Sequence, residues 1–355
     1  MLKRSKSVLA LALASVFAVA AVGCGGEETS STSSTASTSS TASTSSSTAA
    51  DGEIREVEGY PKKNVTFIYA WGPGSATETY CRQLNDWVKN DLGWDKNIVF
   101  TNNEGGAGVI GWTAIANAEP DGYTIGIFNS PGMLNAISNP DITWNLDSYT
   151  IVKNLMDDPG VIFVPAGSEF TTIEELITAA QDPNRTISVA TTGTTTSEAL
   201  AMTLLQRESG ATFRIVPYNS EPEAIVAVRG GHVEVGCLNA SDAGNELANG
   251  DVVALVTGGQ ERAANLPDVP TMIESGYDIE WHAMRIVTGP AGMPEDITTM
   301  LTQAYTRAMK DEANIELATN LQLPIVPDET PEQTRENLQV QWDAYQALWD
   351  EEPWL

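Results

Sequence analysis

Basic residues and histidine are scarce in this chain. Its 355 residues include 19 lysines and arginines against 47 aspartates and glutamates, which gives a formal net charge of −28 at pH 7. A surface with this charge repels phosphate backbones and anionic lipid headgroups, which argues against nucleic acid as a partner. Only His232 and His282 occur, and the three cysteines share no ligand spacing. We therefore expect no metal site and no cofactor.

The N-terminus has a short basic segment followed by an apolar run of 15 residues, and the rest of the sequence contains no apolar segment of that length. That run is shorter than a membrane-spanning helix, so residues 1–23 are interpreted as a secretory signal peptide. Ala21, Val22 and Gly23, followed at once by Cys24, resemble the bacterial lipobox. The resemblance implies cleavage before Cys24 and lipidation of that cysteine. The alternative is an ordinary signal peptide with an incidental cysteine after it.

Residues 29–48 are serine and threonine with two alanines. Such a tract cannot bury apolar surface, so residues 24–59 are expected to form a flexible linker. With a lipid on Cys24, this linker would hold a folded body just outside a membrane, at the cell surface or in the periplasm. Cys81 and Cys237 could pair in that oxidising compartment. They fall in a helix and a strand of different predicted domains, so two buried free thiols are favoured.

From Tyr60 onward, buried strands and amphipathic helices alternate. Repeated βαβ units predict the α/β class, with mostly parallel sheet flanked by helices. The length suits two such domains with a ligand cleft between them. The clearest predicted strands are 65–70, 97–101, 124–128, 151–155, 161–164, 186–190, 213–216, 233–235 and 252–256. The clearest predicted helices are 197–208, 221–229, 295–310 and 331–350.

No catalytic constellation is present in the sequence. The nucleophile elbow G-x-S-x-G is absent, and neither histidine lies beside a nucleophile motif, so the chain is not expected to be an enzyme. Gly106 to Gly111 matches the dinucleotide pattern G-x-G-x-x-G. The following strand ends at Asn129 with no acidic residue for a ribose hydroxyl. This glycine pattern is therefore interpreted as a tight structural turn.

Two polar turns follow predicted strands and lead into helices. Residues 72–78 and 191–198 end in the capping patterns Ser75-x-x-Glu78 and Thr195-x-x-Glu198. Helix N-termini bind anions, so two such turns across a cleft could hold a ligand with two carboxylates. The alternative is ordinary helix capping with no ligand. Trp71 precedes the first turn, where it could either line the cleft or plug the space under the loop.

An ordered set of short motifs carries a family resemblance over Tyr60 to Pro294. The set comprises Tyr60-Pro61, Gly74 to Arg82, Asn102 with Gly105, Gly108 and Gly111, Pro120-Asp121-Gly122-Tyr123-Thr124, Val216-Pro217-Tyr218, Gly230-Gly231-x-Val233-Glu234, Leu266 to Thr271, Glu274-x-Gly276, and Pro290-Ala291-Gly292-x-Pro294. It is similar to that of the solute receptors of tripartite tricarboxylate transporters, the Bug-type binding proteins. Each motif is weak alone, whereas the ordered set is specific.

The resemblance implies a fold of the type II periplasmic-binding-protein kind, with one lobe from residues 60–165 and 285–355 and the other from 166–284. It implies a monomeric solute-binding lipoprotein that captures a small di- or tricarboxylate or aromatic carboxylate and delivers it to membrane permease subunits. A sensor that presents its ligand to a signalling kinase is the alternative, and an extracytoplasmic enzyme is a weaker one. The expected ligand-binding residues are Trp71, Gly74, Ser75, Ala76, Thr77, Glu78, Asn129, Ser130, Gly193, Thr194, Thr195, Thr196, Ser197, Tyr218, Asn239 and Asp242.

The sequence departs from the family pattern at three positions near the expected site. Ser75 replaces a usual glycine, Glu78 a usual aspartate, and Ala199 stands where many members have histidine. These departures concern the identity of the ligand more than the binding role.

Overall fold

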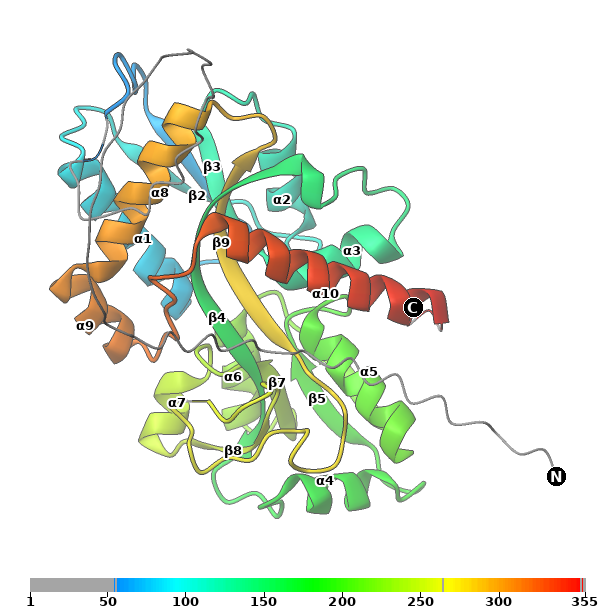
Figure 1. Cartoon of the computed structure of the whole chain (residues 1–355). Coiled ribbons are helices and arrows are strands. Elements are labelled where there is room, and N and C mark those ends of the chain that lie inside the picture. The colour runs from blue at the N-terminus through cyan, green and yellow to red at the C-terminus, as the bar shows by residue number, and fades with distance from the viewer. Residues whose placement is uncertain (1–53, 55, 264, 352, 354–355) are drawn as a thin grey trace, which may run out of the picture. The chain divides into compact units, whose positions relative to one another are not determined.

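Strands and helices alternate through the body of the chain (Figure 1). The computed structural model describes residues 54, 56–263, 265–351 and 353, which belong to one compact unit. The predicted signal peptide, Cys24 and the serine-rich tract lie outside the described residues. The predicted α/β class is confirmed.

Parallel strands joined by helices build both ends of the sheet. At one end, β1 (Val65–Tyr69) pairs in parallel with β2 (Ile98–Asn102) and β3 (Thr124–Asn129), with helices α1 (Ala76–Asp91) and α2 (Val109–Ala116) in the connections. At the other end, β5 (Ile187–Thr191) pairs in parallel with β6 (Phe213–Pro217) and β7 (Val235–Asn239). The connections there are α5 (Ser197–Ser209) and α6 (Glu221–Arg229). Helical crossovers of this kind are what joins neighbouring parallel strands.

Two long strands connect these parallel groups. Strand β4 (Tyr149–Pro165) pairs antiparallel with β9 (His282–Pro290) along its first part, and with β7 and β8 (Val252–Thr257) along its last part. The strand order is β2-β1-β3-β9-β4-β7-β5-β6, with β8 on β4. We call β2, β1, β3, β9 and the start of β4 the first half-sheet, and the end of β4 with β5 to β8 the second half-sheet. The sheet is therefore mixed rather than mostly parallel, because β4, β8 and β9 pair antiparallel.

The sequence predicts two short strands at 151–155 and 161–164, where the structure has the single strand β4. Pro159 and Gly160 suggest a break, yet both continue the strand. Gly160 is needed there because a Cβ at this position would lie 1.6 Å from Nε1 of Trp281. Strand β9 has no counterpart among the predicted strands, although eight of its nine residues are buried.

Separate hydrophobic clusters cover the two half-sheets. One packs the first half-sheet against α1 and α8 (Glu295–Lys310), and two others pack the faces of the second half-sheet against α4 (Ile173–Ala180), α5 and α6. Short helices α3 (Met133–Ser138), α7 (Gly244–Asn249) and α9 (Glu312–Asn320) complete the connections. Each cluster packs one half-sheet mainly against its adjoining helices, although Leu200 of α5 belongs to the first cluster. The lobe limits given above remain predictions.

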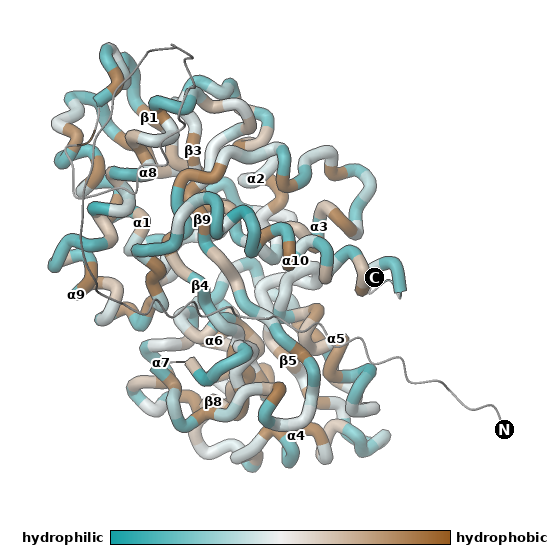
Figure 2. Tube along the Cα trace, viewed as in Figure 1, coloured by the Kyte–Doolittle hydropathy of each residue, from teal (hydrophilic) through white to brown (hydrophobic). Residues whose placement is uncertain are grey.

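Helix α10 (Pro331–Glu351) lies across β4 and contacts α3 (Figure 1). It is largely hydrophilic along its length (Figure 2). Its buried residues are Thr334, Leu338, Gln341 and Tyr345, whose spacing places them on one face of the helix. This narrow stripe is enough to dock the helix on the body.

Both cysteines of the described part are buried and free, as predicted. Burial raises the pKa of both thiols above the ordinary value for cysteine. Both therefore stay protonated and unreactive in the folded protein. Among the helices of the described residues, none is long and apolar enough to cross a bilayer.

Candidate functional site

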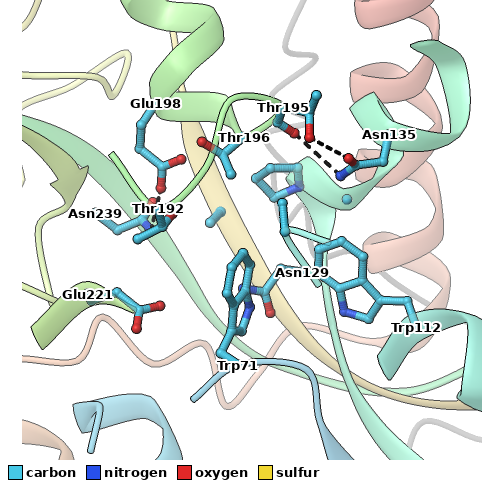
Figure 3. A pocket seen from close by; sticks show the side chains of 14 residues that line it. Trp71, Trp112, Asn129, Asn135, Thr192, Thr195, Thr196, Glu198, Glu221 and Asn239 are labelled. Carbon is cyan, nitrogen blue, oxygen red and sulfur yellow. Dashed lines mark hydrogen bonds between the residues drawn. The ribbon is translucent and has the colours of Figure 1, made fainter. Parts of the chain in front are cut away.

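A small cavity lies at the carboxyl ends of parallel strands from both half-sheets (Figure 3). Trp71 follows β1, Asn129 ends β3, Thr192 follows β5 and Asn239 ends β7. Ligands of α/β proteins bind in this crevice because the strand ends leave loops and helix N-termini around it. The cavity is lined by Trp71, Ala107, Trp112, Asn129, Pro131, Gly132, Asn135, Thr192, Thr195, Thr196, Glu198, Glu221, Asn239 and Ala283.

The cavity volume is about 20 Å³, which is roughly the space of one water molecule. The walls approach each other closely, since a Cβ on Gly193 would lie 3.1 Å from the Cβ of Ala107. A ligand larger than a water molecule therefore needs these walls to separate and close again around it. Hinged closure of this kind is the usual motion of two-lobed binding proteins.

Two tryptophans form the apolar part of the wall. Trp71 and Trp112 meet edge to face with ring centroids 6.0 Å apart. The Trp112 indole donates a hydrogen bond to the Ile127 carbonyl oxygen at 3.1 Å, whereas the Trp71 Nε1 has no partner among the described residues. Trp71 is 7% exposed and lines the cavity. It is a wall residue with one polar atom available to a ligand.

One side-chain pair bridges the two half-sheets across the cavity (Figure 3). Thr195, in the turn before α5, donates its hydroxyl to Oδ1 of Asn135 at 2.5 Å. The Asn135 amide in turn donates to the Thr195 carbonyl oxygen at 3.4 Å. Asn135 belongs to α3 and Thr195 to the turn before α5, so these two bonds connect the two half-sheets across the cavity.

A buried cluster of charged side chains, formed by Asp158, Arg285 and Asp242, lies behind the cavity. Arg285 on β9 donates to Oδ2 of Asp158 at 2.7 Å and to both carboxylate oxygens of Asp242 at 3.2 and 3.3 Å. Asn239 Nδ2 donates to Asp242 Oδ2 at 3.0 Å and to Glu198 Oε1 at 3.2 Å. These hydrogen bonds thus connect the buried Asp158–Arg285 pair to Asn239 and Glu198 in the cavity wall. Although burial disfavours the guanidinium charge, the two aspartates raise the pKa of Arg285 above its ordinary value.

Two buried glutamates face the cavity (Figure 3). Glu198 and Glu221 are 4% and 6% exposed, and each stands in the first turn of its helix, α5 or α6. Burial, followed by the charge of Asp242, raises the pKa of the Glu221 carboxyl to about 8. Burial also raises the pKa of Glu198, although the Thr196 hydroxyl and the Glu198 backbone N–H act in the opposite direction.

The first predicted turn is engaged in contacts of its own. Gly74 donates its N–H to Oε2 of Glu78 at 2.6 Å, and Glu78 pairs with Arg82 at 2.6 Å. Ser75 caps α1 by accepting from the Glu78 N–H at 3.1 Å, as the capping pattern predicts. The Gly74 N–H is therefore already satisfied within the turn.

The second predicted capping pattern is wrong by one residue. Thr196 rather than Thr195 caps α5, because the Thr196 side chain accepts from the Ala199 N–H. Thr195 uses its hydroxyl in the bridge to Asn135 instead. The second turn thus contributes both a helix cap and a contact across the cavity.

Five of the sixteen expected ligand-binding residues line the cavity: Trp71, Asn129, Thr195, Thr196 and Asn239. Eleven do not line it: Gly74, Ser75, Ala76, Thr77, Glu78, Ser130, Gly193, Thr194, Ser197, Tyr218 and Asp242. Ser130 accepts a hydrogen bond from the Met284 N–H and Asp242 pairs with Arg285, so both have partners already. Ligand contact by any of the sixteen remains a prediction.

Glu198 and Glu221 are the important residues that the sequence patterns do not reveal. The capping pattern assigns Glu198 only a helix cap, and Glu221 has no role beyond the start of a predicted helix. The sequence does give a partial indication of their role. Each glutamate begins a helix that directly follows a parallel strand, and side chains at such positions converge on the crevice at the strand ends. Within the described part of the chain, no group of three or more histidine, cysteine or acidic side chains is arranged to hold a metal ion.

Comparison with known proteins gives a consistent result. The family model described as "Tripartite tricarboxylate transporter family receptor" matches residues 80–342. Protein BugT of Bordetella pertussis is 27% identical over 284 residues, which covers 78% of this chain and 85% of BugT. The periplasmic binding protein BugD superposes with a TM-score of 0.75 at 24% identity, over 82% of this chain and 98% of BugD. MatC from Rhodopseudomonas palustris, solved with bound malate, superposes with a TM-score of 0.73 at 24% identity, over 81% of this chain and 99% of MatC. These likenesses confirm the periplasmic-binding-protein fold.

Proposed function

Because this chain belongs to the family of tripartite tricarboxylate transporter receptors, we propose that it captures a small carboxylate outside the cytoplasm and delivers it to membrane permease subunits. The family consists of receptors rather than enzymes. The malate bound to MatC, which shares the fold, supports a carboxylate ligand. The observation that carries the proposal is the cavity at strand ends from both half-sheets.

The cavity offers donors for a carboxylate group. Trp71 presents an indole N–H without a partner in the described structure, and the Thr192 hydroxyl also lines the cavity. Neutral N–H and O–H donors of this kind can hold a carboxylate by hydrogen bonds. The Asn135–Thr195 bridge then gives a means of holding the closed form. Closure would bring residues 60–165 with 285–355 against residues 166–284.

The anchoring scheme is part of this proposal. A signal peptide over residues 1–23 directs export, Cys24 carries the lipid, and residues 24–59 form the linker. The receptor acts as a monomer that is tethered to the membrane by this lipid and linker. The membrane then holds the receptor close to the permease, which favours delivery by raising its effective concentration there.

The test is calorimetry and thermal unfolding of the purified chain with malate, succinate, adipate, citrate and benzoate, with glucose as the neutral control. Linkage predicts stabilisation of about 2.7 kcal/mol when a ligand is present at about 100 times its dissociation constant. Binding of one carboxylate class with no response to glucose supports the proposal. A response to glucose alone would contradict it. Asn135→Ala should weaken binding because it removes the bridge that holds the closed form.

A further inference from the structure

The polar atoms that face the cavity without a partner are mostly acceptors. Oδ1 of Asn129, Oε2 of Glu198, Oε2 of Glu221 and Oδ1 of Asn239 make no hydrogen bond to any described residue. Among the described lining residues, Nε1 of Trp71 is the one donor in the same condition. Buried polar atoms normally have hydrogen-bond partners. A ligand that satisfies these atoms therefore needs several hydrogen-bond donors and few acceptors.

The orientation of the Asn239 amide is fixed by its neighbours. Its Nδ2 donates to carboxylate oxygens of both Glu198 and Asp242, at 3.2 and 3.0 Å. Reversing the amide would place its oxygen against those two carboxylate oxygens. The unpartnered atom is therefore an acceptor, which adds to the two glutamate oxygens beside it.

Glu198 and Glu221 occupy the places that a ligand anion would take. An anion site at a helix N-terminus leaves the N–H groups and the positive end of the dipole open to the ligand. Here α5 and α6 each begin with a buried glutamate that lines the cavity. Both carboxyls lie on the side of the cavity away from Trp112 (Figure 3). That side therefore suits a group of the opposite charge.

The positively charged side chain behind the cavity, Arg285, is already paired with carboxylates. Arg285 is 2% exposed and pairs with both Asp158 and Asp242. Several titratable and charged groups interact with Glu198, with Glu221 or with the Asp158–Arg285–Asp242 cluster. They are Tyr69, Cys81, Asp158, Glu198, Glu221, Cys237, Asp242, His282, Arg285 and Tyr345. With one arginine against several carboxyls, the surroundings favour a positive ligand group.

We propose that this side of the cavity binds an ammonium group between Glu198, Glu221 and the Asn239 amide oxygen, so that the ligand is a small amino-carboxylate rather than a plain carboxylate. This inference rests on the proposed function, since the ligand's carboxylate takes the Trp71 indole N–H on the other side of the cavity. An ammonium group is about as large as a water molecule, and it donates three hydrogen bonds to the three acceptors. The remainder of the ligand occupies space that opens when the walls separate.

Proton exchange gives the proposal a second signature. Burial and Asp242 raise the pKa of Glu221 to about 8, so most of this carboxyl is protonated near pH 7. An ammonium group favours the ionised carboxylate, so its binding releases a proton from Glu221. A plain carboxylate at the same place favours the neutral acid, so its binding takes up a proton. The two ligand classes therefore change the proton balance in opposite directions.

The test compares ligands that differ only by an amino group: butyrate with 4-aminobutyrate, glutarate with glutamate, and propionate with alanine. Calorimetry of the full chain near pH 7, in two buffers of different ionisation enthalpy, gives the affinity and the number of protons exchanged. We expect the amino member of at least one pair to bind about tenfold tighter or more, because charge-assisted hydrogen bonds are the strong ones. Its binding should release protons to the buffer.

Three variants assign the preference to the two glutamates. Glu221→Gln and Glu198→Gln keep the size of the side chain and remove its charge, so each should reduce the amino preference to about twofold or less. Glu223→Gln is the matched control, because Glu223 is an exposed acid on the same helix as Glu221. It should keep the full preference. Circular dichroism verifies that each variant is folded.

The outcomes separate the two proposals. Equal or tighter binding of the members without an amino group, with proton uptake, would overturn the ammonium site and leave the carboxylate receptor standing. So would an amino preference that survives in both glutamine variants. Binding of none of these six compounds, nor of the carboxylates tested above, would overturn the receptor function itself.

Discussion

Raising the pH should destabilise the ligand-free protein, and Glu221 should be a main cause. Its pKa is raised to about 8 by burial and by the neighbouring Asp242 charge, whereas an unfolded glutamate titrates near about 4.3. Between these values the folded state holds a proton that the unfolded state has lost. Stability from this group is therefore fully present below about pH 4 and is lost as the pH rises toward about 8.

The size of the effect follows from the linkage relation. One proton difference changes the free energy of unfolding by about 1.4 kcal/mol per pH unit, so the loss between about pH 5 and pH 7 is about 2–3 kcal/mol. Burial acts on Asp158 and Glu198 with the same sign, because it raises the pKa of both carboxyls. His282 also has the same sign, since Asp157 raises its pKa although burial lowers it. A single pH series of the wild type therefore does not assign the effect to Glu221.

The assay is urea unfolding by tryptophan fluorescence at several pH values between about 5 and 7, for the wild type and Glu221→Gln. Subtracting the two curves removes the contributions that both proteins share. We expect the free energy of unfolding of the variant to fall less steeply, by up to about 1.4 kcal/mol per pH unit. Glu223→Gln should follow the wild type, because Glu223 is exposed. Parallel curves for wild type and Glu221→Gln would refute the reasoning that Glu221 is buried as the neutral acid.

Three further changes test other parts of the structure. Asn135→Ala should weaken ligand affinity about 5- to 10-fold while changing the free energy of unfolding by less than about 1 kcal/mol, which calorimetry and urea unfolding measure together. Arg285→Met should destabilise the fold by about 3–5 kcal/mol, because it leaves two carboxyls buried without their cation, and adding Asp242→Asn should recover part of the loss. Gly160→Ala should lower the free energy of unfolding by more than about 2 kcal/mol, because its Cβ would overlap the Trp281 ring. A stability equal to the wild type in either of the last two variants would contradict the packing described.

Much of the fold is accessible from the sequence because local patterns agree with the tertiary structure. The predicted helices 221–229 and 295–310 coincide with α6 and α8, since each has an apolar stripe and a clear boundary residue. Strand β9 escapes prediction because its residues are buried on both faces and show no alternation. Strand β4 is predicted as two strands because Pro159 and Gly160 usually interrupt a strand. Its continuity depends on contacts with β7, β8 and β9, which no local pattern reveals.

The site is less accessible from the sequence, and for a physical reason. A glutamate in the first turn of a helix has the same local pattern whether it caps the helix in water or faces a cavity. Glu78 and Glu198 both stand in such a turn. Glu78 accepts from the Gly74 N–H and pairs with Arg82, whereas Glu198 keeps one carboxylate oxygen free of any partner in the described structure.

The residue four places further along the helix accounts for this difference. Arg82 stands there after Glu78 and neutralises it on the same helix face, whereas the apolar Met202 stands there after Glu198. The Glu198 carboxyl turns instead to Asn239 and the cavity. Glu221 has the same pattern, because the residue at this spacing is the buried Ile225. Glu223, the third residue of α6, is exposed although the apolar Ala227 lies four places on, so its position in the turn matters too. An acid at the first or second position of a helix that follows a parallel strand, with an apolar residue four places on, is therefore the pattern that predicts a cavity-facing carboxyl.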